Sequence, residues 1–383
     1  MENAKNEILI KESDCKIKII DIPVDFQQGG IRPILGCISY TILILTWGIS
    51  ILIPVGLVYW FFLGNWNMII LLLTIILVPI IFNWHDNVPG VIKYLSNLLT
   101  KDVHHWTGKL INFYSLFLII IFILILGPGK IIIEDPDFDV NSKQLLCLHP
   151  HGILGIGSMY IIISGIFSKL HLIVTESLVW LQPIISVILN STVKLRGASH
   201  FSFKQTMKRE EGPLVMFPGG FHETILLNWG KDAVFIERRF GFIKYCLKYN
   251  YLIRPVYVFG ECLSFHQFQH FKRFRWILND FSLPSVIFCG ETWWNPLLPL
   301  RNVPYLIVIG KPINSDIINN SYNSKLNNNN NPSREMVKKY HSLYIQNLKR
   351  IYTQYSPFYQ SFFNDHPLLE RYIQNKSKEL TIE

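Results

Sequence analysis

The chain has 383 residues, of which 50% are hydrophobic and only 16% are charged, and its formal net charge is +9. Because soluble domains carry about 25% charged residues, this composition favours a membrane protein whose apolar residues are clustered. The positive charge suits anionic lipid headgroups or a polyanionic small molecule. The chain has no Lys/Arg block or aromatic-basic motif, so nucleic acid is not an expected partner.

Residues 34–84 contain no Asp, Glu, Lys or Arg, which is more apolar chain than one membrane span of about 20 residues needs. Gly64 and Asn65 interrupt this stretch. The pattern predicts a transmembrane helical hairpin, with one helix within 34–62 and a second within 66–82. The alternative is a buried pair of soluble helices, which would normally keep a polar face.

A third apolar segment, at 110–126, lies in the connector 85–127 and is marginal in length for a span. Lys and Arg are concentrated in the N-terminal tail, 1–33, and after residue 127. The positive-inside rule places both regions in the cytosol, which requires an even number of crossings. We therefore expect this segment to be interfacial or re-entrant; three true spans are the alternative.

The region 128–383 is predicted to be an α/β domain with a central, largely parallel sheet, anchored by the hairpin. Short apolar runs that stop at glycine or proline turns alternate in it with helix-like stretches. The runs are at 143–148, 213–217, 252–259 and 305–310. In such folds, sites form at the carboxyl ends of the strands.

One helix is predicted between the second and third of these runs, and an insertion followed by a second helix after the last. Residues 237–250 place Phe242, Tyr245 and Tyr249 on one side and Lys244 and Lys248 on another. Residues 319–332 are asparagine-rich and are expected to be a disordered insertion without a catalytic role. Residues 333–356 then form an amphipathic helix with Ser333 as its N-cap. Its apolar face is Val337, Tyr340, Tyr344, Leu348 and Ile351.

The first polar turn is HPHG, in which His149 and His151 flank Pro150 and Gly152 follows. Histidine is the side chain best suited to take a proton near neutral pH. The apolar helix expected from Ile153 would place free N–H groups beside the histidines, where they could stabilise an oxyanion. The alternatives are two histidines that merely close a turn, or metal ligands; no Cys/His cluster or HExxH supports a metal site.

The second polar turn is PGGFHE, where Gly219 and Gly220 are followed by Glu223. Its carboxylate could orient a histidine and stabilise the protonated ring. Alternatively, it could interact only with the dipole of the following helix. A third glycine turn with an acid is Gly260-Glu261. GxSxG, GxGxxG and P-loop patterns are missing, which suits a histidine base acting without a covalent intermediate.

Together these motifs resemble the type 2 diacylglycerol acyltransferase family, which includes monoacylglycerol and wax-alcohol acyltransferases. The resemblance covers roughly 140–355 and rests on the order of the motifs. They are HPHG at 149–152, PGGxxE at 218–223, the RxGF…PVxxFGE block at 238–261, VIGKPI at 308–313 and the helix at 340–352. A phospholipid-type acyltransferase would have an aspartate four residues after a histidine, and neither histidine has one.

The resemblance implies transfer of a fatty acyl group from acyl-CoA to a lipid hydroxyl, most directly diacylglycerol to triacylglycerol, with no cofactor and no metal. Monoacylglycerol or a long-chain alcohol are alternative acceptors, and an inactive lipid-binding membrane protein is the alternative of another class. The location implied is the endoplasmic reticulum membrane, with several spans and a cytosolic catalytic domain, and lipid droplets.

Carried over by position, His151 is the base that deprotonates the acceptor hydroxyl, His149 supports it, and Glu223 is their partner. Backbone N–H groups near Gly152 or the Gly219-Gly220 pair would stabilise the oxyanion.

Four basic side chains are candidates for binding the CoA phosphates, with an ordinary solvated helix face as the alternative. They are Arg238, Arg239, Lys244 and Lys248. The chain departs from the family pattern in the third apolar segment, in the asparagine run and in Arg254, which stands where an apolar residue is expected. Residues 171–206 match poorly, and acceptor selection could lie there.

Overall fold

The structure is a computed structural model, and it describes the chain in twelve ranges. They are 18–22, 56–81, 127–167, 169–176, 193–229, 232–280, 285–291, 299–300, 303–314, 316, 331–362 and 380–383. The chain divides into two units, the first formed by 1–25, 126–168 and 207–383 and the second by 26–125 and 169–206. The third apolar segment at 110–126 and most of the asparagine-rich insertion lie outside the described residues.

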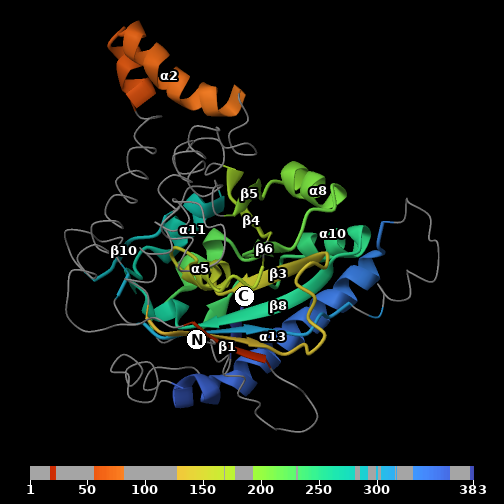
Figure 1. Ribbon diagram of the computed structural model, residues 1–383. Helices are drawn as coiled ribbons and strands as arrows, with labels where there is room; N and C mark the ends of the chain where they lie inside the picture. The colour runs from red at the N-terminus through yellow and green to blue at the C-terminus, as the bar shows by residue number, and fades with distance from the viewer. Residues whose placement is uncertain are drawn as a thin grey trace, which may run out of the picture. The chain divides into compact units, whose positions relative to one another are not determined.

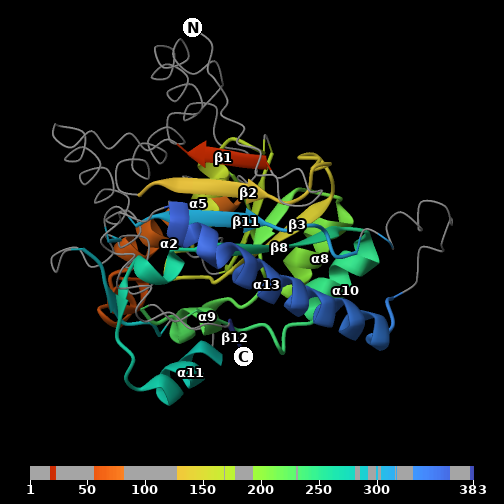
Figure 2. The ribbon, with the colours of Figure 1, turned by 90° about the horizontal axis from the view of Figure 1, so that it is seen from below.

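The first unit is built on a mixed sheet (Figure 1) whose strands follow the order β1-β2-β11-β8-β3-β6; β1 to β3 of this order are labelled in Figure 2. Their bounds are β1 Lys18–Ile22, β2 Gly129–Ile133, β11 Tyr305–Ile309, β8 Leu252–Phe259, β3 Gln144–His149 and β6 Leu214–Met216. The pairs β2–β11, β3–β8 and β3–β6 are parallel, whereas β1–β2 and β8–β11 are antiparallel. The prediction of an α/β fold with a largely parallel sheet is confirmed, and the four predicted runs match β3, β6, β8 and β11 within one residue at either end.

The central strands are largely apolar on both faces because helices cover both. In β8, the rings of Tyr257 and Phe259 contact Tyr352 of α13 (Arg334–Phe362). The intervening Val258 points the other way, to α5 (Ile156–Ile163), where a Cβ on Gly157 would lie 2.6 Å from its side chain. Figure 2 shows α13 running along β8 and β11. Strands covered on both faces are expected to be continuous hydrophobic runs, as these are.

The structure confirms the predicted C-terminal helix, although α13 continues to Phe362. Its first turn is capped as expected, with the Met336 N–H donating to the Ser333 hydroxyl at 3.1 Å. All five predicted apolar-face side chains are buried.

The predicted face of the other helix was wrong. In α10 (Gly241–Tyr249) the buried side chains are Phe242, Ile243, Cys246 and Leu247. Tyr245 and Tyr249 are half-buried instead and stack on each other, with ring centroids 6.3 Å apart. Of the three predicted aromatic side chains, only Phe242 therefore faces the core.

Part of the predicted N-terminal tail belongs to the sheet. Residues 18–22 form β1, which pairs antiparallel with β2 as an edge strand, and Asp21 forms an ion pair with Lys130. The strand contains Ile19, which is buried. The tail was not recognised as a strand because a single short run has no periodicity to distinguish it.

The second unit contains β4 (His171–Val174) and β5 (Lys194–Gly197), which pair in parallel, and the start of α8 (His200–Lys208). It also contains α2, Trp66–Ile81, which occupies the second predicted hairpin helix. Residues 56–62 are helical as well, and the chain turns at Gly64, whose φ is 66°. The Asn65 side chain then accepts a hydrogen bond from the Met68 N–H at 3.3 Å, as an N-cap does.

None of the helices in the described ranges combines the length and hydropathy needed to cross a bilayer. The rest of the predicted hairpin, 34–55 and 82–84, lies outside those ranges. The transmembrane hairpin therefore stays a prediction.

The remaining described elements of the first unit are short. They are α9 Phe221–Leu226, β7 Ala233–Val234, the 3-10 helix Glu261–Leu263, β9 His266–Gln267, α11 Lys272–Asp280, β10 Phe288–Cys289 and β12 Thr381–Ile382. β9 pairs antiparallel with β10, and β7 pairs in parallel with β12.

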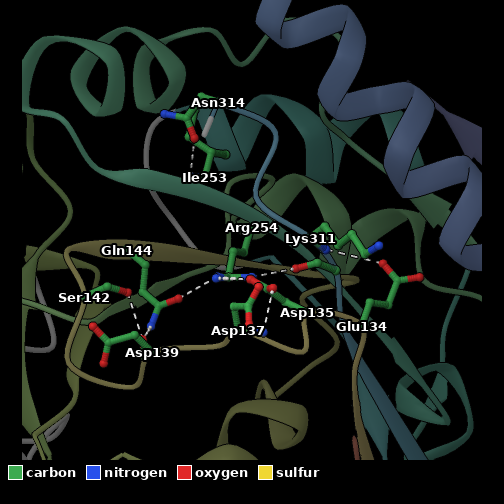
Figure 3. A network of polar contacts seen from close by, with 11 residues as sticks. Glu134, Asp135, Asp137, Asp139, Ser142, Gln144, Ile253, Arg254, Lys311 and Asn314 are labelled. Atoms are coloured by element: carbon green, nitrogen blue, oxygen red, sulfur yellow. Dashed lines mark hydrogen bonds and ion pairs between the residues drawn. The ribbon is translucent and has the colours of Figure 1, made fainter. Parts of the chain in front are cut away.

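Arg254, which departs from the expected apolar pattern, has a structural explanation (Figure 3). It is 2% exposed. Its Nε donates to the Gln144 side chain at 2.6 Å, and its Nη2 donates to Asp135 at 2.7 Å. Its guanidinium lies 4.8 Å from the centre of the Phe138 ring. A buried charge is tolerated here because it is paired and hydrogen-bonded.

Replacing Arg254 by methionine is expected to lower the free energy of unfolding by about 1–3 kcal/mol, because Gln144 and Asp135 lose their buried donor. Thermal unfolding of the detergent-solubilised full chain measures this change. Lys338→Met on the exposed side of α13 is the control and should leave stability nearly unchanged. Equal stability of the two variants would contradict this role of Arg254.

Candidate active site

The two polar turns meet because β3 and β6 are parallel neighbours. β3 ends at His149, and β6 ends at Met216, directly before the turn that leads into α9. The carboxyl ends of both strands lie at the same edge of the sheet, where α/β folds place their sites. The HPHG turn and Glu223 are therefore neighbours, although they are more than seventy residues apart in the sequence.

Glu223, which is 0% exposed, holds this arrangement together. Its Oε1 lies 2.5 Å from Nδ1 of His149 and accepts the Phe235 N–H at 3.1 Å. Its Oε2 accepts the His151 N–H at 2.8 Å. A carboxylate that accepts two backbone N–H groups acts as an acceptor towards the imidazole, so Nδ1 of His149 carries the hydrogen. The predicted contact between Glu223 and both histidines is thus present; their catalytic roles stay predictions.

His149 is enclosed. Its side chain is 0% exposed, and its ring lies 6.0 Å from the Tyr344 ring of α13. With the hydrogen on Nδ1, the other ring nitrogen, Nε2, carries a lone pair, and it has no hydrogen-bond partner among the described residues. The ring is fixed in orientation, but no face of it meets solvent.

His151 is half-buried and is the more accessible of the two. Its Nδ1 donates to the Gly152 carbonyl at 2.9 Å, which leaves the lone pair on Nε2. Its ring lies 4.6 Å from that of Phe217. Burial lowers the pKa of His151 below 6.5, with smaller opposing effects from the Gly152 carbonyl and Glu223. A neutral imidazole with a free lone pair at pH 7 is the form that a general base requires.

The helix after the HPHG turn does not offer the free N–H groups that the sequence predicted. It begins at Ile156, not at Ile153. The N–H groups of Ile156 and Gly157 donate to Glu261 at 3.0 and 2.9 Å. The prediction was wrong because a carboxylate more than one hundred residues away satisfies the start of the helix.

Glu261 also explains the glycine of HPHG. Gly152 has a φ of 65°, and a Cβ there would lie 2.0 Å from the Glu261 carboxylate. Glu261 is 1% exposed. Burial raises its pKa to about 8, although the Gly157 and Ile156 N–H groups oppose the shift. In the sequence, Glu261 is only an acid after the third glycine turn, and no contact with the histidine turn was predicted for it.

The two glycines of the second polar turn are required by the backbone geometry there. A Cβ on Gly219 would lie 2.2 Å from the Glu223 carboxyl, so only glycine lets that side chain fold back. Gly220 has a φ of 56°, and its N–H donates to the Phe217 carbonyl at 3.1 Å. The Gly220 N–H is therefore engaged in the turn, contrary to its predicted availability for an oxyanion.

The four predicted CoA-binding residues do not share one surface environment. Arg238 and Lys244 are exposed. Arg239 is half-buried; its Nη2 donates to Nδ1 of His222 at 3.0 Å, and its guanidinium lies 5.1 Å from the Phe235 ring centre. Lys248 is half-buried as well.

Both half-buried cations already have neighbours. Burial lowers the pKa of Arg239, while Glu223 and Asp280 favour its charged form. Lys248 donates to the Asn331 side chain at 2.7 Å. Within the described ranges, no group of three or more His, Cys, Asp or Glu side chains is arranged to hold a metal ion.

Glu261→Gln is expected to change how stability depends on pH. The pKa of Glu261, about 8 in the folded chain, lies above the usual 4.5 of a glutamate, so between these two pH values the folded chain retains a proton that the unfolded chain has lost. Glu261 therefore makes stability fall as pH rises between these two values. The melting temperature of wild type relative to Glu261→Gln should decrease from about pH 5 to about pH 8. Parallel pH curves for the two chains would exclude this titration.

The chain is similar to known proteins over the region that contains these motifs. The family model described as "Diacylglycerol acyltransferase" matches residues 89–366. Human "Diacylglycerol O-acyltransferase 2-like protein 6" is 25% identical over 256 residues, covering 61% of this chain and 71% of that protein.

Two further relatives are similar to the same degree. Mouse "Acyl-CoA wax alcohol acyltransferase 2" is 25% identical over 58% of this chain and 68% of its own length. Bovine "2-acylglycerol O-acyltransferase 1" is 25% identical over 60% of this chain and 70% of its own length. No solved structure matches the chain significantly.

Proposed function

The chain belongs to the diacylglycerol acyltransferase family and is an acyltransferase, and from this premise we propose that it transfers a fatty acyl group from acyl-CoA to a lipid hydroxyl. The acceptor proposed is diacylglycerol, which gives triacylglycerol. The observation that supports the mechanism best is His151, a half-buried neutral imidazole with its lone pair on Nε2, beside a carboxylate that fixes the turn.

In the proposed reaction, Nε2 of His151 takes the proton of the acceptor hydroxyl as its oxygen attacks the thioester carbonyl. The tetrahedral intermediate then collapses, the carbon–sulfur bond breaks, and the CoA thiolate receives the proton from His151. The products are an ester and free CoA. No cofactor takes part.

His149 and Glu223 act as positioning residues in this proposal. Glu223 accepts the His151 N–H and therefore fixes the backbone of the base. The ring of His149 holds the same carboxylate in place from the strand end. The competing assignment makes His149 the base, since its Nε2 has no partner in the described part of the chain; this would require substrate to reach a fully buried ring.

The motifs do not distinguish the acceptor, because all candidates present a hydroxyl on a lipid. The names of the relatives include a wax alcohol and a 2-acylglycerol as well as diacylglycerol. Monoacylglycerol or a long-chain alcohol is thus the second candidate. A lipid-binding protein without activity is the candidate of another class.

Acyl-CoA carries phosphates, and the exposed Arg238 and Lys244 are the two predicted cations proposed to bind them. The proposed location is the endoplasmic reticulum membrane, with a cytosolic catalytic unit and with lipid droplets as a second site. The apolar stretch 34–84 supports an anchor in the membrane.

The test is to express the chain in cells that lack neutral-lipid synthesis and to supply labelled oleoyl-CoA with a panel of acceptors. Chromatography of the products should show labelled triacylglycerol when diacylglycerol is supplied. Labelled diacylglycerol or wax ester instead would move the acceptor to the second candidate. No ester from any lipid hydroxyl would overturn the proposed activity.

A further inference from the structure

Helix α11, Lys272–Asp280, buries polar side chains and exposes apolar ones, unlike an ordinary surface helix. Its two fully buried side chains are polar, with Arg275 3% exposed and Asn279 5% exposed. The half-buried Trp276 packs beside them on the rings of His222 and Phe235. Its outward side chains include Phe274, 60% exposed, and Ile277, 54% exposed. Surface helices normally turn their apolar face to the core and their polar face to water. This orientation therefore requires an explanation.

Hydrogen bonds from the inward face fix the orientation of α11. Arg275 donates through Nε to the Ser285 carbonyl at 2.7 Å and through Nη1 to the Phe268 carbonyl. Asn279 donates to the Phe221 carbonyl at 2.7 Å. Turning the apolar face inward would break these bonds and leave part-buried carbonyl groups without donors.

The exposed apolar face continues onto the β9–β10 ribbon. Phe271, directly before α11, is 74% exposed, and Phe268 and Ile287 are 42% and 57% exposed. The last two lie opposite each other, since the Phe268 N–H donates to the Ile287 carbonyl at 2.9 Å. We call these five side chains the apolar surface: Phe268, Phe271, Phe274, Ile277 and Ile287. Single exposed apolar residues are common, but such a group marks an interaction site.

Two cations adjoin this group. Lys272 and Arg273 are both exposed and stand between Phe271 and Phe274 in the sequence; Lys272 also forms an ion pair with Glu383 at 3.8 Å. Aromatic and aliphatic side chains mixed with Lys and Arg are typical of helices that lie in the interface of a bilayer with anionic lipids. The core of a protein–protein interface is instead depleted of lysine. We propose that the apolar surface docks the catalytic unit on a membrane leaflet containing anionic lipid, with the α11 side chains inserted at headgroup level.

The apolar surface is linked to the candidate active site through α9. Figure 2 shows α11 beside α9, and the Asn279–Phe221 hydrogen bond joins the two helices. α9 carries Glu223, and the Phe221 ring lies 6.3 Å from that of His151. A leaflet bound by α11 would thus present lipid next to the helix that supports the base. The inference rests on the proposed function only for the lipid nature of the acceptor.

Site-specific photocrosslinking of the full chain tests this surface. Phe274 is replaced by the photoreactive residue p-benzoylphenylalanine, and the chain is reconstituted in vesicles of phosphatidylcholine with or without phosphatidylserine, each containing labelled phospholipid. The control carries the same residue at Lys338, which is exposed on α13. Lipid adducts at position 274 are expected to exceed those at 338 several-fold. Position 277 supplies a second probe if the first chain fails to accumulate.

A separate variant tests the contribution of positive charge to lipid binding. Arg273→Ser is expected to lower the adduct yield about fivefold in vesicles with phosphatidylserine and to change it little without that lipid. Equal lipid labelling at 274 and 338 would overturn the proposal. Crosslinking of 274 to a second copy of the chain or to another protein would overturn it as well. Crosslinking needs no turnover, so failure here is distinguishable from failure of the proposed acyl transfer.

Discussion

Replacing His151 by alanine is expected to lower kcat by about 10²–10⁴-fold, the usual contribution of a general base. The variant should fold, because the half-buried ring makes its ring hydrogen bond to the neighbouring Gly152 carbonyl, while Glu223 binds the backbone N–H that alanine retains. Steady-state transfer of labelled oleoyl from oleoyl-CoA to diacylglycerol by the solubilised full chain measures the loss. Normal activity would remove His151 from the role of base.

His222→Ala is the matched control for this variant. His222 lies in the second polar turn, yet its ring bonds Arg239 and Asp280 and stacks on Phe235 instead of joining the Glu223 cluster. Its loss should cost far less activity than the loss of His151. Similar losses in both would show that the assay reports general damage to the turn.

The dependence of kcat/KM on pH tests whether His151 is the base. Because burial lowers the pKa of His151 below 6.5, the acid limb of the wild-type kcat/KM profile should have its midpoint below pH 6.5. An acid limb centred above 6.5 would contradict this environment for the base.

Replacing Glu223 by glutamine is expected to reduce kcat more than it changes KM and to destabilise the chain by about 2–4 kcal/mol. The carboxylate is fully buried and has three polar contacts, two with backbone N–H groups and one with the His149 ring. An amide accepts through one atom only and turns its NH₂ towards at least one existing donor, which leaves buried groups unsatisfied. Kinetics and thermal unfolding on the same preparation measure both effects.

This variant also tests positioning against simple structural support. If Glu223 positions the base, kcat should stay low in glycerol-stabilised preparations whose melting temperature matches wild type. Recovery of kcat together with stability would mean that Glu223 supports only the fold.

Local patterns were enough to predict much of this architecture. β8 was predicted at its observed bounds because an apolar run ending at Gly260 is a strong strand signal. The α13 face and its Ser333 cap follow from helical periodicity and capping, which depend on neighbours in sequence. The two polar turns were placed at one sheet edge by the general geometry of parallel strands.

The features that sequence analysis missed depend on partners distant in the chain. The helix N–H groups near His151 are occupied by Glu261, and no local signal relates a carboxylate to a helix start more than one hundred residues away. Arg254 appeared anomalous for the same reason, since Gln144 and Asp135 become its neighbours only in the folded sheet. The burial of Arg275 in α11 could not be predicted from the helix alone. The carbonyl groups that accept its hydrogen bonds belong to Phe268 and Ser285, which lie outside the helix.

The most direct test of the account is the formation of triacylglycerol by the purified full chain from labelled oleoyl-CoA and diacylglycerol, with free CoA measured in the same reaction. The account predicts equal amounts of ester and free CoA from wild type, and only background amounts of both from His151→Ala. Equal ester formation by the two chains, or CoA release without ester in wild type, would contradict it.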